Sequence, residues 1–195
     1  MIKTTSMIMD ELKEFKSPED KLTRLVRSGK YIKIIRGLYE TNPNIPGYLL
    51  AESIYGPSYL SFEYALSYHG MIPEAVHAYT SATFEKKKKK RYTTPFGTYL
   101  YQDVPSQIYT FGVDIVQEGD YYFKIATTEK ALCDQLYKLP PVSNYKELNA
   151  LLLEDLRIDV QNIRKLNTDD IHFYSKHYGS TNIKKLCSLL LRRQL

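Results

Sequence analysis

The chain has 195 residues, of which 43% are hydrophobic and 25% are charged, so a packed core is expected and disorder is excluded as the dominant state. The net charge is +5, but basic residues outnumber acidic ones in residues 1–40 and 157–195, whereas acidic residues outnumber basic ones in residues 92–156. This distribution favours a polyanionic partner, although solvated surface charge accounts for part of any such pattern.

The cysteines and the hydropathy indicate a cytoplasmic protein. Cys133 and Cys187 each lie within an apolar helical pattern, where a free thiol behaves as a small hydrophobic group, and a reducing compartment is therefore expected. The N-terminus lacks the apolar core of a signal peptide, and no apolar run approaches the length of a membrane span. We expect no membrane association.

The stretch SPEDKLTRLVRSGKYIKIIRGLYE, residues 17–40, predicts a helix followed by a two-stranded hairpin. Ser17 can cap a helix, Pro18 suits its first position, and Gly29 can end it. Residues 31–35 are mostly β-branched or aromatic, and Arg36 with Gly37 predicts a turn into a second strand. A basic helix leading into a basic hairpin is typical of a winged helix, in which the helix enters the major groove and the hairpin reaches flanking phosphates.

Six cations in this stretch are the candidate DNA contacts. They are Lys21, Arg24, Arg27, Lys30, Lys33 and Arg36. The simpler alternative is a helix with ordinary solvated charges beside a hairpin. The segment TNPNIPG, residues 41–47, is rich in proline and asparagine and predicts a boundary between a winged-helix domain at residues 1–43 and a second domain at residues 47–195.

The second domain reads as a mixed α/β unit with a helical C-terminus, so the fold class expected for the whole chain is α+β. Two short helices are expected up to residue 70, and short strands with glycine and proline turns between residues 78 and 123. Helices are then expected at residues 127–139, 146–155, 161–166, 168–178 and 181–191. Within the first of these, Lys130 lies four residues before Asp134, which predicts a helical salt bridge.

A run of six cations interrupts the strand region: Lys86, Lys87, Lys88, Lys89, Lys90 and Arg91. Alternate residues of a half-buried strand face the core, so this run must project as a hairpin tip or an exposed edge. A lysine-rich edge deters aggregation between sheets. The alternative is an electrostatic contact with phosphate or with an acidic protein surface.

The sequence contains no catalytic signature, so we expect no enzyme activity, no metal and no cofactor. Gly179 and Ser180 are not followed by the paired aspartates that a nucleotidyltransferase needs to hold magnesium. The histidines do not have the spacing of a metal site. A metal-dependent nuclease is the less favoured alternative, and its candidate residues are Asp114, Glu118, Asp120 and Lys124.

Four segments together resemble the AbiEi family, the antitoxins and transcriptional regulators of type IV toxin–antitoxin systems. They are LTRLVRSGKYIKIIRGLYE, YLSFEYALSYHGMIPE, the YTSAT strand with PFGTYLY, and YYFKIATTEKALCDQLY, of which the last is the most specific. The likeness extends along nearly the whole chain. Only about sixteen residues precede the predicted helix, so the winged helix is abbreviated at its start.

The resemblance implies a function in phage defence. Members of the family bind inverted repeats in their own promoter through a winged helix, which implies double-stranded DNA contacts at the six cations of residues 21–36. The second domain would oppose a nucleotidyltransferase-like toxin. A stand-alone winged-helix regulator without a toxin is the alternative from the same class.

Overall fold

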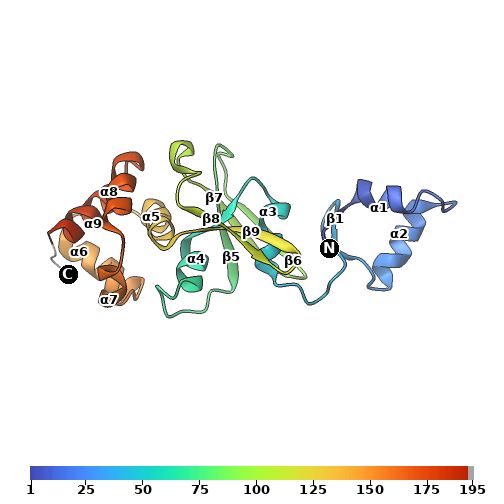
Figure 1. Cartoon of the computed structure of the whole chain (residues 1–195), viewed down its shortest axis with the longest axis horizontal. Coiled ribbons are helices and arrows are strands. Elements are labelled where there is room, and N and C mark those ends of the chain that lie inside the picture. The colour runs from blue at the N-terminus through green and yellow to red at the C-terminus, as the bar shows by residue number, and fades with distance from the viewer. Residues whose placement is uncertain (193–195) are drawn as a thin grey trace.

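The computed structural model describes residues 1–192 and has a mixed α+β fold, as expected from the sequence. Its parts follow one another along a single long axis, with a small N-terminal unit at one end, a large sheet in the middle and a group of helices at the other end (Figure 1). Within residues 1–192, no helix is both long enough and apolar enough to cross a membrane.

The N-terminal unit has two helices packed on a three-stranded antiparallel sheet of order β1-β3-β2. Its elements are β1 (Lys3–Thr4), α1 (Thr5–Glu11), α2 (Pro18–Arg27), β2 (Ile32–Ile35) and β3 (Leu38–Glu40). The predicted helix and hairpin are confirmed, whereas β1 and α1 were not predicted. Ser17 occupies the cap position of α2, but its hydroxyl donates to the Asp20 carboxylate at 2.7 Å instead of accepting from the backbone.

The central sheet has six strands in the order β6-β7-β5-β4-β9-β8. The strands are β4 (Tyr59–Leu60), β5 (Ala78–Thr83), β6 (Lys90–Thr94), β7 (Gly97–Asp103), β8 (Val113–Glu118) and β9 (Tyr121–Ala126). The pairs β5/β7 and β4/β9 are parallel, and the remaining pairs are antiparallel. The predicted strand region is confirmed, but the two-residue strand β4 is too short to give a sequence signal.

Helices cover the sheet and form the C-terminal part. They are a 3-10 helix (Gly47–Leu50), α3 (Ala51–Ile54), α4 (Phe62–Tyr68), a second 3-10 helix (Ser106–Ile108), α5 (Thr128–Lys138), α6 (Tyr145–Ala150), a π-helical segment (Leu151–Asp155), α7 (Val160–Arg164), α8 (Thr168–His177) and α9 (Thr181–Leu191). The predicted C-terminal helices are confirmed, and the one expected at residues 146–155 is α6 continuing into the π-helical segment.

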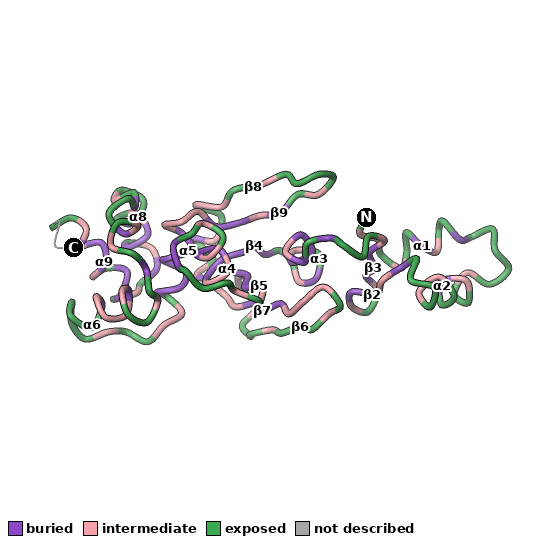
Figure 2. Tube along the Cα trace, turned by 90° about the horizontal axis from the view of Figure 1, so that it is seen from below, coloured by how far each residue is buried: buried purple, intermediate pink, exposed green. Residues whose placement is uncertain are grey.

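The hairpin β2–β3 lies between two hydrophobic cores. Ile34 and Leu38 belong to the main core, which continues through the central sheet into the C-terminal helices, whereas Tyr31 belongs to a small core beneath α1 and α2. Buried backbone runs through the middle of the molecule, while much of α1 and α2 is exposed (Figure 2). The hairpin therefore packs against the second predicted domain, and the boundary at residues 41–47 stays a prediction.

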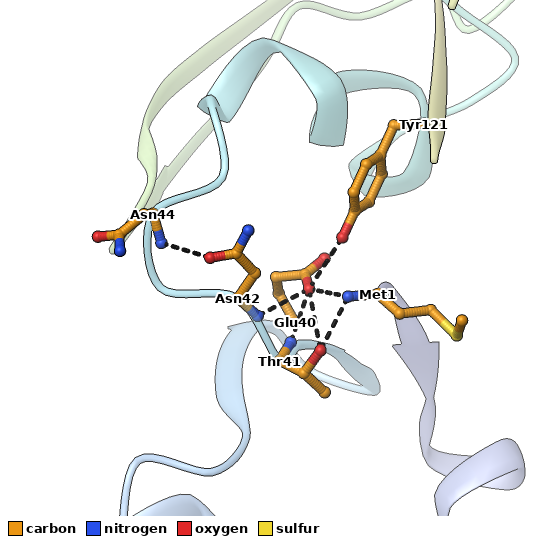
Figure 3. Close-up of polar contacts among 6 residues, drawn as sticks. All are labelled: Met1, Glu40, Thr41, Asn42, Asn44 and Tyr121. Atoms are coloured by element: carbon orange, nitrogen blue, oxygen red, sulfur yellow. Dashed lines mark hydrogen bonds and ion pairs between the residues drawn. The ribbon is translucent and has the colours of Figure 1, made fainter. Parts of the chain in front are cut away.

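A buried carboxylate fastens the hairpin to the central sheet (Figure 3). Glu40, at the end of β3, accepts hydrogen bonds from the backbone N–H groups of Thr41 and Asn42 at 2.7 and 2.9 Å, and from the Tyr121 hydroxyl on β9 at 3.2 Å. The amine of Met1 also contacts it. Burial raises the pKa of Glu40, but the Met1 ammonium and the backbone N–H groups of Asn42 and Thr41 outweigh burial and leave the pKa below its usual value.

Two buried tyrosines on β7 bind the turn that follows the hairpin. The hydroxyls of Tyr99 and Tyr101 donate to the carbonyls of Gly47 and Ala51 at 2.8 and 2.7 Å. An added Cβ on Gly47 would lie only 2.3 Å from the Phe96 carbonyl oxygen, so this position requires glycine because of the close backbone approach.

Candidate nucleic-acid interface

Helix α2 turns an apolar side to the small core and a polar side to solvent. Leu22 is buried, and the half-buried Leu25 and Val26 pack with it against Ile8 and Leu12. Because these residues recur at helical spacing, the remaining positions of α2 form a continuous outer face. Arg24 and Arg27, two of the candidate cations, lie exposed on that face.

The structure leaves most of the six candidate cations exposed. Arg24, Arg27, Lys30, Lys33 and Arg36 are exposed, whereas Lys21 is half-buried. The Lys21 ammonium lies 4.7 Å from the ring centroid of Phe15, a cation–π contact that holds it against the loop between α1 and α2. Lys21 is therefore less available to a ligand than the other five.

These six cations form no ion pair with any carboxylate of residues 1–192. Two other lysines of the same unit do, since Lys3 pairs with Glu11 at 2.7 Å and Lys13 with Asp10 at 3.3 Å. Lys16, in the loop before α2, is likewise exposed and unpaired within residues 1–192, and Glu19 and Asp20 in the first turn of α2 offset part of the charge of that helix. The positive charge left over lies toward the C-terminal turn of α2, the turn after it and the hairpin, which is a distribution expected of a surface that meets phosphates.

Four of the five exposed cations come from the last turn of α2, the turn after it and the sheet face on which the helices lie. Arg24 and Arg27 occupy the last turn of α2, and Lys30 follows in the turn. Lys33 pairs directly with Tyr39, which packs on the small core, so Lys33 shares the sheet face on which the helices lie. Arg36 lies in the turn after β2, about 10 Å from Lys33 at about 3.3 Å per residue.

A stabilising role within α2 is also open to Arg24 and Arg27. Cations in the last turn of a helix interact favourably with the partial negative charge of its C-terminus, by about 0.3–1 kcal/mol each. This interaction needs no ligand. It does not apply to Lys33 or Arg36, which belong to the hairpin.

The lysine run occupies the loop before β6 and the start of that edge strand, so its predicted exposure at an edge is confirmed. Lys87, Lys88, Lys89 and Arg91 are exposed, whereas Lys90 is half-buried. The run is partly fixed in place, because the Lys86 ammonium donates to the Gly56 carbonyl at 3.1 Å and lies 5.2 Å from the ring centroid of Tyr55.

The sequence did not reveal a buried polar cluster around Asp134, on α5. The predicted salt bridge between Lys130 and Asp134 is confirmed at 3.0 Å, but both side chains are fully buried. Asp134 also accepts from the hydroxyls of Tyr59 at 3.0 Å and Ser61 at 2.6 Å, and from the Tyr178 hydroxyl at the end of α8. The sequence of α5 has apolar residues around most of the helix, and this pattern could have predicted that the helix is buried.

The chemistry of the Asp134 cluster is that of a structural tie. Burial lowers the pKa of Lys130, and the charge and hydrogen bond of Asp134 oppose this effect. Burial next to the same carboxylate raises the pKa of Tyr59 and Tyr178 well above the usual tyrosine value. The cluster joins the central sheet, α5 and α8. Its hydroxyl and ammonium donors all reach Asp134, and the Lys130 ammonium also donates to the Tyr178 hydroxyl.

The candidate nuclease residues do not converge. Asp114 and Glu118 lie on β8, about 13 Å apart at about 3.3 Å per residue. The Glu118 carboxylate accepts a hydrogen bond from the Tyr48 hydroxyl at 2.6 Å. The Lys124 ammonium on β9 pairs with Glu52 at 2.7 Å and not with a carboxylate of β8. Within residues 1–192, no group of three or more histidine, cysteine or acidic residues has the arrangement of a metal site.

Comparison with known proteins assigns no family to this chain. No family model matches it, and no match is found among curated proteins. The resemblance to the AbiEi family therefore rests on the four sequence segments described above.

Proposed function

We propose that residues 1–40 form a winged-helix unit that binds double-stranded DNA. The observation that carries the proposal is the group of exposed, unpaired cations on α2, its following turn and the hairpin. Helix α2 would enter the major groove, with Arg24 and Arg27 toward the DNA. Lys30 and Lys33 would contact the flanking phosphates.

The dimensions of α2 suit this role. Its ten residues give a length of about 15 Å at about 1.5 Å per residue, and the major groove, about 12 Å wide, admits a helix of this kind. Arginine is well suited to the groove because its guanidinium can bind guanine or a phosphate through two hydrogen bonds. The hairpin is anchored through Ile34 and Leu38 in the main core, so the basic surface has a rigid support.

We further propose that the protein is the antitoxin and autorepressor of a type IV toxin–antitoxin system, which is what the AbiEi resemblance implies. Its DNA target would be inverted repeats in its own promoter, and its partner a nucleotidyltransferase-like toxin. A stand-alone regulator would use the same DNA surface and would differ in having no toxin to oppose. The apolar side of α9, with Ile183 and Leu186, is buried, so a toxin would bind elsewhere on the second domain.

The DNA surface is tested by replacing Arg24 and Arg27 with alanine in the full chain. A matched control replaces Lys176 and Lys184 on α8 and α9, two exposed cations at the opposite end of the molecule (Figure 1). Binding to a labelled duplex from the region upstream of the gene is measured between about 50 and 200 mM salt. A scrambled duplex of the same length measures non-specific binding.

The wild type should prefer the upstream duplex, and its affinity should fall steeply as salt rises. Loss of Arg24 and Arg27 should weaken binding about tenfold or more and reduce the salt slope by about 1–2, because each phosphate contact contributes about one unit. The control should match the wild type within about twofold. If the Arg24 and Arg27 double variant bound the upstream duplex as tightly as the Lys176 and Lys184 control, the proposed surface would be contradicted.

A further inference from the structure

A basic cavity of about 310 Å³ lies between the lysine run and the helices on one face of the central sheet. Leu100 on β7 forms part of its floor, and its register partners Arg91 on β6 and Thr80 on β5 share that sheet face. The Thr80 hydroxyl donates to the Ser61 carbonyl at 2.6 Å, so the start of α4 covers β5 at this level. Phe62, the first residue of α4, also lines the cavity, and the cavity lies next to it on the face of β6 and β7.

The charge around this cavity is of one sign. Lys89, Lys90, Arg91 and Lys138 line it, and none of its lining residues is acidic. Lys138 is paired with Glu63, at the edge of the helices. The three cations of the lysine run have no carboxylate partner in residues 1–192, so an anion entering the cavity would meet uncompensated charge.

The rest of the lining is suited to a ligand with a planar, partly apolar body. The half-buried Leu100 offers apolar surface beside the cations, whereas Phe62 is only 2% exposed and its ring lies under the Lys138 ammonium, 5.5 Å from the ring centroid. The half-buried side-chain amide of Gln102 also lines the cavity and has no hydrogen-bond partner in residues 1–192, so it is available to a polar ring edge. The volume is at the lower limit of small-molecule sites, about 300–1,000 Å³, and corresponds to a single nucleotide.

This cavity is separate from the proposed DNA surface. The other end of β6 turns at residues 95–96, and the Phe96 carbonyl lies beside Gly47, which follows the N-terminal unit. Lys90 begins β6 and Thr94 ends it, about 13 Å away at about 3.3 Å per residue. The lysine run therefore points away from the winged-helix candidate and does not extend its basic surface.

We infer that this cavity binds a mononucleotide. Arg91 and Lys89 hold its phosphate, the base lies over Leu100, and the Gln102 amide meets a polar edge of the base. The guanidinium of Arg91 is the group best suited to grip phosphate oxygens, because it can donate two parallel hydrogen bonds. The inference does not depend on DNA binding by residues 1–40.

The test is calorimetric titration of the full chain at low salt with AMP, ATP, tripolyphosphate and a short oligothymidylate. One double variant, Lys89→Ser with Arg91→Ser, removes two charges from the cavity. The matched control, Lys87→Ser with Lys88→Ser, removes two charges from the same run at positions that do not line it. Circular dichroism melting confirms that each variant is folded.

We expect the wild type to bind AMP, and ATP more tightly because it carries more charge. The cavity variant should lose about tenfold or more in affinity for both, whereas the control should lose about twofold or less. Absence of AMP and ATP binding, or equal losses in the two variants, would overturn the inference. Tripolyphosphate binding as tightly as ATP would show that the apolar floor has no role, and tighter binding of oligothymidylate at the same residues would assign the cavity to single-stranded nucleic acid. Either result would also overturn it.

Discussion

Replacing Asp134 with asparagine should be among the most destabilising single changes in this protein. The substitution leaves the Lys130 ammonium fully buried without its counter-charge, and it weakens the acceptor on which the hydroxyls of Tyr59 and Ser61 converge. Removing one partner of a buried ion pair costs about 3–5 kcal/mol of unfolding free energy. With a urea dependence of about 2 kcal/mol per molar, the unfolding midpoint should fall by about 1.5–2.5 M.

The matched control is Glu74→Gln. Glu74 pairs with Arg157 at 2.7 Å, but these side chains are 43% and 63% exposed, so the loss should stay below about 1 kcal/mol. The double variant Lys130→Met with Asp134→Asn removes both charges and should be less destabilised than Asp134→Asn alone. If Asp134→Asn costs no more than the control in urea unfolding, the cluster is not the structural tie described here.

The pH dependence gives a second check on the same cluster. The folded-state pKa of Lys130 is lowered, so between that pKa and the usual lysine pKa of 10.5 the unfolded chain binds more protons and stability rises with pH. Asp134 opposes this lowering, and its replacement should move the start of the window to lower pH. The stability deficit of Asp134→Asn should therefore shrink as the pH rises toward the folded-state pKa of Lys130 in the wild type and stay level from there to 10.5, and a deficit that is constant throughout would contradict the assignment.

Three further outcomes follow from the other contacts. The lowered pKa of Glu40 contributes stability that is present above its unfolded value of 4.5 and is lost as the pH falls through the folded pKa. Glu40→Gln should therefore reduce the pH dependence of the urea unfolding midpoint between about pH 5 and pH 3, and an unchanged pH dependence would refute this. Gly47→Ala should cost about 1–3 kcal/mol in the same assay because its Cβ meets the Phe96 carbonyl, and a neutral effect would show that the turn can shift. Under the proposed antitoxin function, alanine at Arg24 and Arg27 should abolish promoter repression and still permit rescue of growth from the proposed toxin, whereas joint loss in a folded variant would place toxin control in the N-terminal unit.

Local signals in the sequence were sufficient for the elements that carry the candidate DNA surface. Proline and acidic residues at the start of α2, glycine after it and β-branched residues in β2 each act over a few positions, and all agree with the structure. The exposure of the lysine run also follows from local chemistry, because six consecutive cations cannot face a core.

The features that depend on distant partners could not be predicted in this way. Strand β1 forms by pairing with β3, some 35 residues later, and two residues give no periodicity. The burial of Asp134 depends on Tyr59 and Tyr178, which lie 75 and 44 residues away. The basic cavity likewise forms only where β6, β7, α4 and the end of α5 meet. The cations of the cavity could be read from the sequence, but the apolar residues that line it with them could not.

Hydrogen exchange of the full chain with and without the upstream duplex is the most direct test of the proposed DNA interface. We predict that DNA protects backbone amides in residues 18–36, and that residues 84–94 and 160–192 exchange at unchanged rates. This pattern follows because the cations of α2 and the hairpin would be covered, while the lysine run lies at the other end of β6. Protection confined to residues 84–94, with none in residues 18–36, would contradict DNA binding by the N-terminal unit.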